Sequence, residues 1–261
     1  MYLTTTGTTE TRPDARPRVA LITGGTSGIG RATAELLLDR GHHVALTGHD
    51  PETVARARDD LPGALVISAD ARSVKETERA VSQVRSALGL IDTLFLNAGV
   101  NVTRELSQWD EATFDDVFAT NTRGQFFTLV HALPHLADGA SVVVNVGIGA
   151  SRGAPGMSVG AGSRGALLAM LPSLAIELAP RGIRVNAVSP GAVETPIWRK
   201  AGLSPAAVEA TLEHLARSTP LGRAGRPSDI ASTVAFLASA EASYITGREV
   251  VVAGGLGLGL T

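Results

Sequence analysis

Seven short apolar runs recur along the chain from Arg18 onward, and helix-length polar segments separate most of them. The runs are RVALIT, HVALT, ALVIS, DTLFL, SVVVNV, IRVNAV and EVVVA. Continuous runs of Val, Ile and Leu are typical of parallel strands that are covered on both faces. Right-handed crossovers between such strands produce a doubly wound sheet. The sequence therefore predicts an α/β, Rossmann-type fold with a seven-stranded parallel sheet and helices on both faces.

The 261 residues divide into a polar start and one long α/β segment. Residues 1–17 are rich in Thr and lack the apolar core of a signal peptide, so we expect a flexible tail and a cytoplasmic protein. Residues 18–261 are expected to form a single domain, because no linker, internal repeat or low-complexity run interrupts 18–255. No stretch is expected to be long and apolar enough to span a bilayer.

Charge and composition narrow the choice of partner. The formal net charge of -2 provides no basic footprint for nucleic acid or for an anionic membrane, so a small-molecule partner is expected. The absence of Cys excludes disulfides, thiolate catalysis and Cys-ligated zinc. His131 and His135 could share a helix face, but no carboxylate stands at the usual zinc spacing, so no metal site is expected.

A glycine-rich turn, TGGTSGIG, follows the first predicted strand and opens a helical pattern that ends at Gly41. Glycines permit a tight turn and bring backbone N–H groups close to a pyrophosphate, whose charge the helix N-terminus favours. A plain β-to-α turn also uses glycine, but the preceding strand and the following helix strengthen the prediction. The expected phosphate loop contains Gly24, Thr26, Ser27, Gly28, Ile29 and Gly30.

The spacing T-G-x-x-x-G-x-G, with the motifs that follow it, resembles the short-chain dehydrogenase/reductase family from Arg18 to about Leu256. The motifs are SADA, LNAG, SPGAVETP, PLGRAGRPSDIASTVAFLAS and ASYITG. The resemblance implies a nicotinamide dinucleotide, with its adenine ring at Asp70 and Ala71 and its adenine ribose passing Asn97, Ala98 and Gly99. It also implies that the nicotinamide carboxamide is held by Pro190, Gly191, Val193 and Thr195. Near the C-terminus, Ala253 stands where the family usually has Asp.

The end of the second predicted strand bears on which dinucleotide is used. Family members that use NAD generally carry an Asp there, whereas this chain has Gly48, followed by His49. With no carboxylate to repel a 2′-phosphate, the resemblance favours NADP(H) over NAD(H), with His49 near the phosphate. Two alternatives stay open: His49 is a solvated loop residue, or Asp50 turns toward the ribose.

The stretch from Asn145 to Leu168 matches the family's catalytic segment without most of its catalytic side chains. Family members use a Ser that hydrogen-bonds the substrate oxygen, a Tyr that donates the proton, a Lys that holds the nicotinamide ribose, and an Asn that anchors a water relay. Aligned through GAPGMSV, the Tyr position is Gly160, the Lys position is Arg164 and the Ser position is Gly147, while Asn121 is retained. The resemblance therefore implies a degenerate centre in which Asn121 and Arg164 are the catalytic candidates.

Several residues could take over parts of the missing chemistry. Arg164 could bind the ribose hydroxyls, but its high pKa makes it a poor proton donor. Ser158 and Ser163 could bind a substrate oxygen, or they could be ordinary helix-cap and helix-face hydroxyls. Asn121 could equally only bridge its helix to a strand.

The two glycines at the Ser and Tyr positions also create volume beside the expected nicotinamide. We expect Gly147, Ser158, Gly160 and Trp198 to contact a bulky substrate, and the segment of about 197–218 to form a lid over it. The lid's apolar face could instead be ordinary packing.

Three functions are compatible with this pattern. The first is an NADP(H)-dependent reductase for a substrate that needs no Tyr acid. The second is a non-redox cyclase, dehydratase or isomerase that reuses the fold, and the third is a cofactor-binding pseudoenzyme or regulatory subunit. The resemblance also implies a homodimer or homotetramer.

Overall fold

The computed structural model describes residues 16–200 and 204–258, and in it the seven expected strands form one parallel sheet. The strands are β1 (Val19–Ile22), β2 (His43–Gly48), β3 (Ala64–Ser68), β4 (Ile91–Leu96), β5 (Leu136–Asn145), β6 (Arg184–Pro190) and β7 (Glu249–Val252). Their order is β3-β2-β1-β4-β5-β6-β7, and all neighbours are parallel. The predicted Rossmann-type architecture is confirmed.

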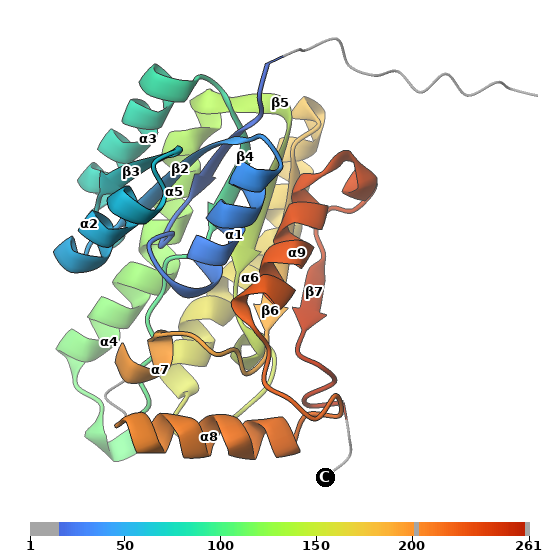
Figure 1. Cartoon of the computed structure of the whole chain (residues 1–261). Coiled ribbons are helices and arrows are strands. Elements are labelled where there is room, and N and C mark those ends of the chain that lie inside the picture. Colours follow the sequence, from blue (N-terminus) through green and yellow to red (C-terminus); the bar gives the residue numbers. More distant parts are fainter. Residues whose placement is uncertain (1–15, 201–203, 259–261) are drawn as a thin grey trace, which may run out of the picture.

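Helices cover both faces of the sheet, and the strands are therefore apolar on both sides (Figure 1). One layer contains α1 (Gly28–Asp39), α2 (Pro51–Asp60) and α9 (Pro227–Ala238), and the other contains α3 (Val74–Leu88), α5 (Gln125–Ala132) and α6 (Ser158–Leu178). Successive residues of β1 divide between these layers: Val19 and Leu21 pack toward α3, α5 and α6, whereas Ala20 and Ile22 pack toward α1, α2 and α9. This alternation is why the strand reads VALI, with no polar residue.

The long central helical segment is interrupted, although its sequence resembles one continuous helix. α4 (Glu111–Phe118) passes through a π-helical turn at Ala119–Gly124 into α5. Gly124 lies so close to the loop after β3 that a Cβ on it would stand 1.9 Å from the carbonyl oxygen of Ala71. π-helical turns inside α-helices often mark functional sites, and this one contains Asn121.

The segment expected to form a lid contains α7 (Ile197–Lys200) and α8 (Pro205–Arg217), while residues 201–203 lie outside the described ranges. Both helices lie at the edge of the molecule where the strands have their carboxyl ends (Figure 1). The side chain of Ser204 begins α8, because its Oγ accepts a hydrogen bond from the backbone N–H of Ala207 (3.3 Å). The tail expected at 1–17 lies outside the described residues, apart from its last two.

One helical stretch corrects an expectation from the sequence. Residues 158–181, which comprise α6 and the turn after it, are long and apolar enough by composition to cross a membrane, with a mean hydropathy of 1.3. The core helix of a soluble protein passes the same test, so this length and composition are weak grounds for a membrane span. Leu167 and Leu171 of this helix pack in the core against the sheet.

Candidate functional site

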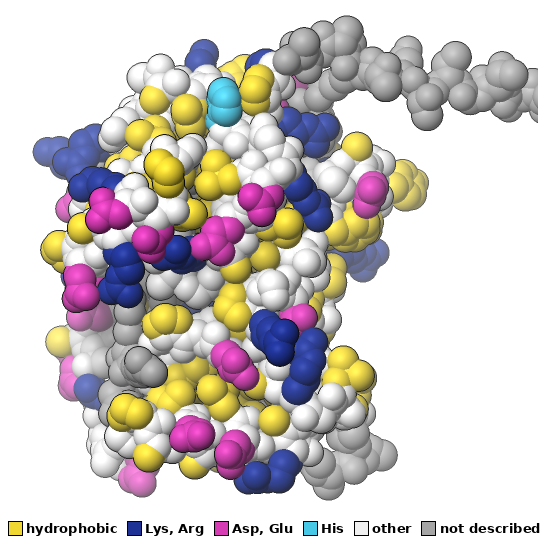
Figure 2. Space-filling model, viewed as in Figure 1, with side chains coloured by type: hydrophobic (Ala, Val, Ile, Leu, Met, Phe, Trp, Pro, Cys, Tyr) yellow, Lys and Arg dark blue, Asp and Glu magenta, His cyan; other side chains and the backbone are white. Residues whose placement is uncertain are grey.

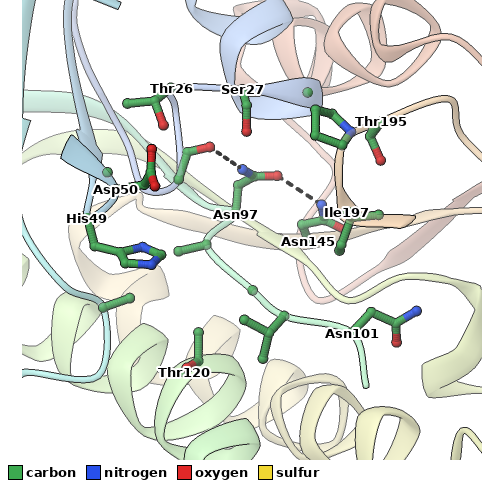
Figure 3. Close-up of a pocket in the computed structure, with 18 of the residues that line it drawn as sticks. Thr26, Ser27, His49, Asp50, Asn97, Asn101, Thr120, Asn145, Thr195 and Ile197 are labelled. Atoms are coloured by element: carbon green, nitrogen blue, oxygen red, sulfur yellow. Dashed lines mark hydrogen bonds between the residues drawn. The ribbon is translucent and has the colours of Figure 1, made fainter. Parts of the chain in front are cut away.

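A cavity of about 410 Å³ opens where the carboxyl ends of β1, β2 and β4 meet the beginning of α1. This is the point at which the strand order reverses, where doubly wound folds bind ligands. Figure 3 shows His49 and Asp50 at one end of the cavity and Asn101, Thr195 and Ile197 at the other. The structure brings most of the predicted cofactor residues to its wall: Gly24, Thr26, Ser27, Gly28, Ile29, His49, Asp70, Ala71, Asn97, Ala98, Gly99, Arg164 and Thr195.

The glycine-rich loop has the geometry of a phosphate cradle. Gly24 and Gly28 have φ angles of 61° and 55°, in the left-handed region that favours glycine. Ser27 precedes α1 without any side-chain capping bond, so its hydroxyl leaves the first N–H groups of that helix to a ligand. Gly30 does not line the cavity. Its Cβ would lie 2.3 Å from the carbonyl oxygen of Gly24, so this glycine permits close packing of the helix on the loop.

The floor of the cavity is a hydrogen-bonded junction between three strand ends. Asn97 donates from Nδ2 to the carbonyl oxygen of Gly24 (3.0 Å), and its Oδ1 accepts from Nδ2 of Asn145 (2.9 Å; Figure 3). The hydroxyl of Thr23 accepts from the backbone N–H groups of Asn97 (2.9 Å) and Ala98 (3.0 Å). These bonds join the loops after β1, β4 and β5 into a preformed surface beneath a ligand.

The end of β2 is closely packed. A Cβ on Gly48 would lie 2.5 Å from Cγ2 of Thr26, so any larger residue at position 48 requires Thr26 to move. Asp50 caps α2, with Oδ1 accepting from the backbone N–H of Thr53 (2.8 Å). His49 is exposed at the rim of the cavity.

Asp70 lies at the expected adenine end of the cavity. Nη2 of Arg72 stands 2.8 Å from its Oδ2, and this guanidinium holds the pKa of Asp70 below its usual value. The carboxylate is therefore ionised and fixed in position at neutral pH.

A second cavity, of about 510 Å³, adjoins the first and is mainly apolar. The two share Ile29, Asn101, Asn145, Arg164, Thr195 and Ile197. The predicted residues on its wall are Gly147, Gly160, Arg164, Pro190, Gly191, Val193, Thr195 and Trp198. No tyrosine or lysine is among the described residues that line either cavity.

Arg164 lies at the junction of the two cavities. Its Nη1 donates to the carbonyl oxygen of Asn145 (3.2 Å), and no carboxylate among the described residues forms an ion pair with it. Burial lowers the pKa of Arg164 to about 10, because the charged form loses hydration. The guanidinium is still protonated at neutral pH.

The two glycines of the second cavity differ in backbone conformation. Gly147 has φ 67° and ψ 152°, a region that side-chain-bearing residues avoid, although no atom lies within 4 Å of the place where its Cβ would be. Gly160 is an ordinary helical residue of α6, and its Cβ would touch only Oδ1 of Asn101, at 3.4 Å. A side chain at position 160 is therefore accommodated more easily than one at 147.

Two predicted side chains do not reach the cavities. Asn121 is only 2% exposed. Its Oδ1 accepts from the N–H of Val100 (2.8 Å), and its Nδ2 donates to the hydroxyl of Ser163 (3.0 Å). Ser158 begins α6, is exposed, and lines neither cavity. The substrate contact of Ser158 and the catalytic role of Asn121 stay predictions, and the positions of these two side chains do not support them.

Ser163 is fully buried, and its hydroxyl donates to the carbonyl oxygen of Gly160 (2.9 Å). The sequence left two hypotheses for Ser163, a contact with a substrate oxygen and an ordinary helix-face hydroxyl, and the structure favours the second.

The structure also places residues at the site that the sequence analysis did not identify: Asn101, Arg152, Met157, Leu215 and Leu256. Met157 lies in the GAPGMSV stretch, which gave the alignment but no role for this residue, and the other four belong to no motif named above. Leu215 carried a partial signal, because the amphipathic pattern of α8 predicted that one of its faces is covered.

The sheet order, the glycine cradle and the cavity at the strand ends define a nucleotide-binding protein of the Rossmann class. A family model described as enoyl-(acyl carrier protein) reductase matches residues 24–257. The chain belongs to the short-chain dehydrogenase/reductase family of oxidoreductases, as its motifs predicted.

Known proteins resemble the chain along nearly its whole length. L-fucose dehydrogenase of Mus musculus is 32% identical over 245 residues, which are 93% of this chain and 89% of the relative. Hydroxynaphthalene reductase of Aspergillus fumigatus is 32% identical, over 88% of this chain and 89% of its own length. A blue fluorescent protein from a metagenomic library, solved in complex with NADPH, has a TM-score of 0.86 and 30% identity, over 93% of this chain and 98% of its own. These relatives support use of a nicotinamide cofactor.

Proposed function

We propose that the protein is an NADP(H)-dependent reductase of a bulky or electrophilic substrate that does not need a tyrosine proton donor. The observation that carries this proposal is the junction of the two cavities. A glycine cradle suited to a dinucleotide leads directly into an apolar space at Gly147 and Gly160, where the described lining residues include no tyrosine. The degenerate centre predicted from the motifs is part of the proposal.

A site without a tyrosine proton donor suits only substrates that can accept a hydride without receiving a proton from the protein. A bound nicotinamide cofactor supplies a hydride. Hydride addition to an ordinary ketone leaves an alkoxide that requires an acid, whereas addition to an iminium carbon neutralises the nitrogen and requires no proton. A quinone methide or an enone conjugated to a phenol delocalises the electron pair, and solvent then supplies the proton. Such acceptors suit a site without a phenol.

The preference for NADP(H) has three supports. Gly48 carries no carboxylate, and Thr26 fills the place where one would begin. Asp50 is engaged in capping α2, so turning to the ribose would compete with that bond. His49 remains as a polar group at the rim. Thermal unfolding with NADPH, NADH and neither tests the preference: the larger shift should come with NADPH, and an equal or larger shift with NADH would contradict it.

The redox step is tested by stopped-flow measurement of NADPH absorbance with an iminium salt, a quinone methide precursor and a hydroxylated naphthoquinone. Consumption of NADPH by at least one class supports a reductase. Product formation that continues after NADP(H) is removed would indicate a non-redox enzyme. Cofactor binding without turnover of any acceptor would indicate a pseudoenzyme.

A homodimer or homotetramer, in the cytoplasm, completes the proposal. Only 28% of the apolar window of α6 is buried within the chain, and Ile176 on this helix is 75% exposed. A second copy would cover this face. Light scattering should therefore give a mass of two or four chains, and a monomer would contradict the proposal.

A further inference from the structure

The second cavity has charge of only one sign on its wall. Arg152 and Arg164 line it, and no Asp or Glu is among the described residues that do so. Elsewhere acidic and basic side chains are interspersed, as on the face drawn in Figure 2. The positive character of this apolar space is therefore local, and it contrasts with the protein's formal net charge of -2.

Arg164 and Gly160 line the second cavity from the same helix. Arg164 follows Gly160 by four residues on α6, so the two lie on one helix face, and side chains on a helix lean toward its N-terminus. Arg164 lines this cavity, and its Nη2 lies 2.5 Å from the place that a Cβ on Gly99 would take. Asn101 borders the same space, because its Oδ1 lies 3.4 Å from the place of a Cβ on Gly160. Arg164 and Asn101 thus line the same cavity as Gly160, whose own position leaves room for a ligand.

Among the described residues, the guanidinium of Arg164 has few hydrogen-bond acceptors and no counter-charge. A guanidinium has five N–H donors, and among the described residues this one has a single hydrogen-bond acceptor, the carbonyl oxygen of Asn145. The hydroxyls of a nicotinamide ribose could accept further hydrogen bonds, but they carry no charge. A partly buried cation without a counter-charge is costly, and a bound anion would reduce that cost.

We propose that the second cavity, which Asn101 also lines, binds a substrate with an apolar body and one ionised acidic oxygen group, a carboxylate or its equivalent, which pairs with Arg164. Arg152, exposed on the same wall and held by a hydrogen bond from Nη1 to the carbonyl oxygen of Gly257, adds positive charge. This inference rests on the proposed function in one respect: the acid is called the substrate because a reductase would bind it beside the nicotinamide.

The test compares acids with their neutral esters. Benzoate, 2-naphthoate and anthracene-2-carboxylate, each with its methyl ester, are titrated calorimetrically into the protein with and without saturating NADP⁺. The best-fitting acid should bind about 10–100-fold more tightly than its ester, the range expected for hydrogen bonds to a charged group. Arg164→Met should abolish this preference, and Arg164→Lys should retain part of it. Arg58→Gln, which removes an exposed charge from α2 at a residue that lines neither cavity, should leave the preference unchanged.

Each outcome bears on the inference. Equal affinities of acid and ester, failure of all three acids to bind, or an acid preference that survives in a folded Arg164→Met variant would overturn it. If the Arg164→Met variant does not fold, the inference is tested by the wild-type protein alone: a higher affinity for the acid than for its ester supports it, and equal affinities overturn it. Failure of the proposed function is a different result: NADP⁺ then fails to bind, or NADPH is not consumed, whatever the acid preference.

Discussion

A Cβ atom on Gly99 would lie 2.5 Å from Nη2 of Arg164, so the absence of a side chain at position 99 gives the guanidinium its place. The backbone after β4 and the side chain from α6 meet at this contact. Gly99→Ala should therefore displace the guanidinium and weaken binding of acidic ligands by about tenfold. In a double-mutant cycle with Arg164→Met, the two losses should not add, because both act through the same group. Additive losses would show that Gly99 acts independently.

Restoring a serine at position 147 should destabilise the protein. The φ of 67° at Gly147 is unfavourable for a residue with a Cβ, even though space is available. Gly147→Ser should lower the free energy of unfolding by about 1–3 kcal/mol, measured by urea denaturation. Gly149→Ser is the matched control, because its Cβ would meet no atom within 4 Å and its φ is not positive. Equal stability of the two variants would contradict the argument.

A tyrosine at position 160 should instead be tolerated by the fold. The Cβ contact with Asn101 at 3.4 Å is an ordinary one, and the ring would enter the second cavity. Gly160→Tyr should therefore keep its affinity for NADPH within about threefold, while binding of bulky ligands falls by tenfold or more because the cavity is filled. Gly162→Tyr places the same ring two residues along α6 at an exposed position. It should change neither the affinity for NADPH nor the binding of bulky ligands.

The close contact between Gly48 and Thr26 predicts a defect that a second change should relieve. Gly48→Ala puts a methyl group 2.5 Å from Cγ2 of Thr26 and so moves the glycine-rich loop. The affinity for NADPH should fall by roughly tenfold, since a displacement of this size disturbs several phosphate contacts. Adding Thr26→Ser, which removes that methyl group but keeps the hydroxyl, should recover part of the loss. A fluorescence titration with NADPH measures the loss of affinity in Gly48→Ala and its recovery in the double variant. A Gly48→Ala variant with unchanged affinity for NADPH would contradict the prediction.

The lowered pKa of Arg164 gives binding of acids a specific pH dependence. With a pKa of about 10, the guanidinium is charged throughout the neutral range and loses its proton as pH rises through that value. A carboxylate pairs only with the charged form, so its affinity should be constant from pH 6 to 8 and should fall above about pH 10. The methyl ester has no charge to pair and should show no such fall. Circular dichroism at each pH checks that the protein remains folded.

Much of the fold could be predicted from the sequence because its signals are local. Uninterrupted apolar runs such as VALI in β1 require burial on both faces, and the glycines of TGGTSGIG require a tight turn before a helix. The central helical segment is a different case, because α4 and α5 are separated by a π-helical turn that no local sequence pattern predicts. The last residue of this turn, Gly124, lies against the backbone of Ala71, which is far away in the chain.

The sequence by itself determined the seven parallel strands of a doubly wound sheet, the glycine-rich loop after the first strand, and the residues at 147, 160 and 164. Only the tertiary structure decided what those residues can do. It showed that Gly147 has a backbone conformation unfavourable for serine and that Ser158 lines neither cavity. It also showed that Arg164 lies against Gly99, with no carboxylate of the described residues paired to it. The physical reason is that secondary structure follows from neighbouring residues, whereas the charge and shape of a cavity depend on segments that meet only after folding.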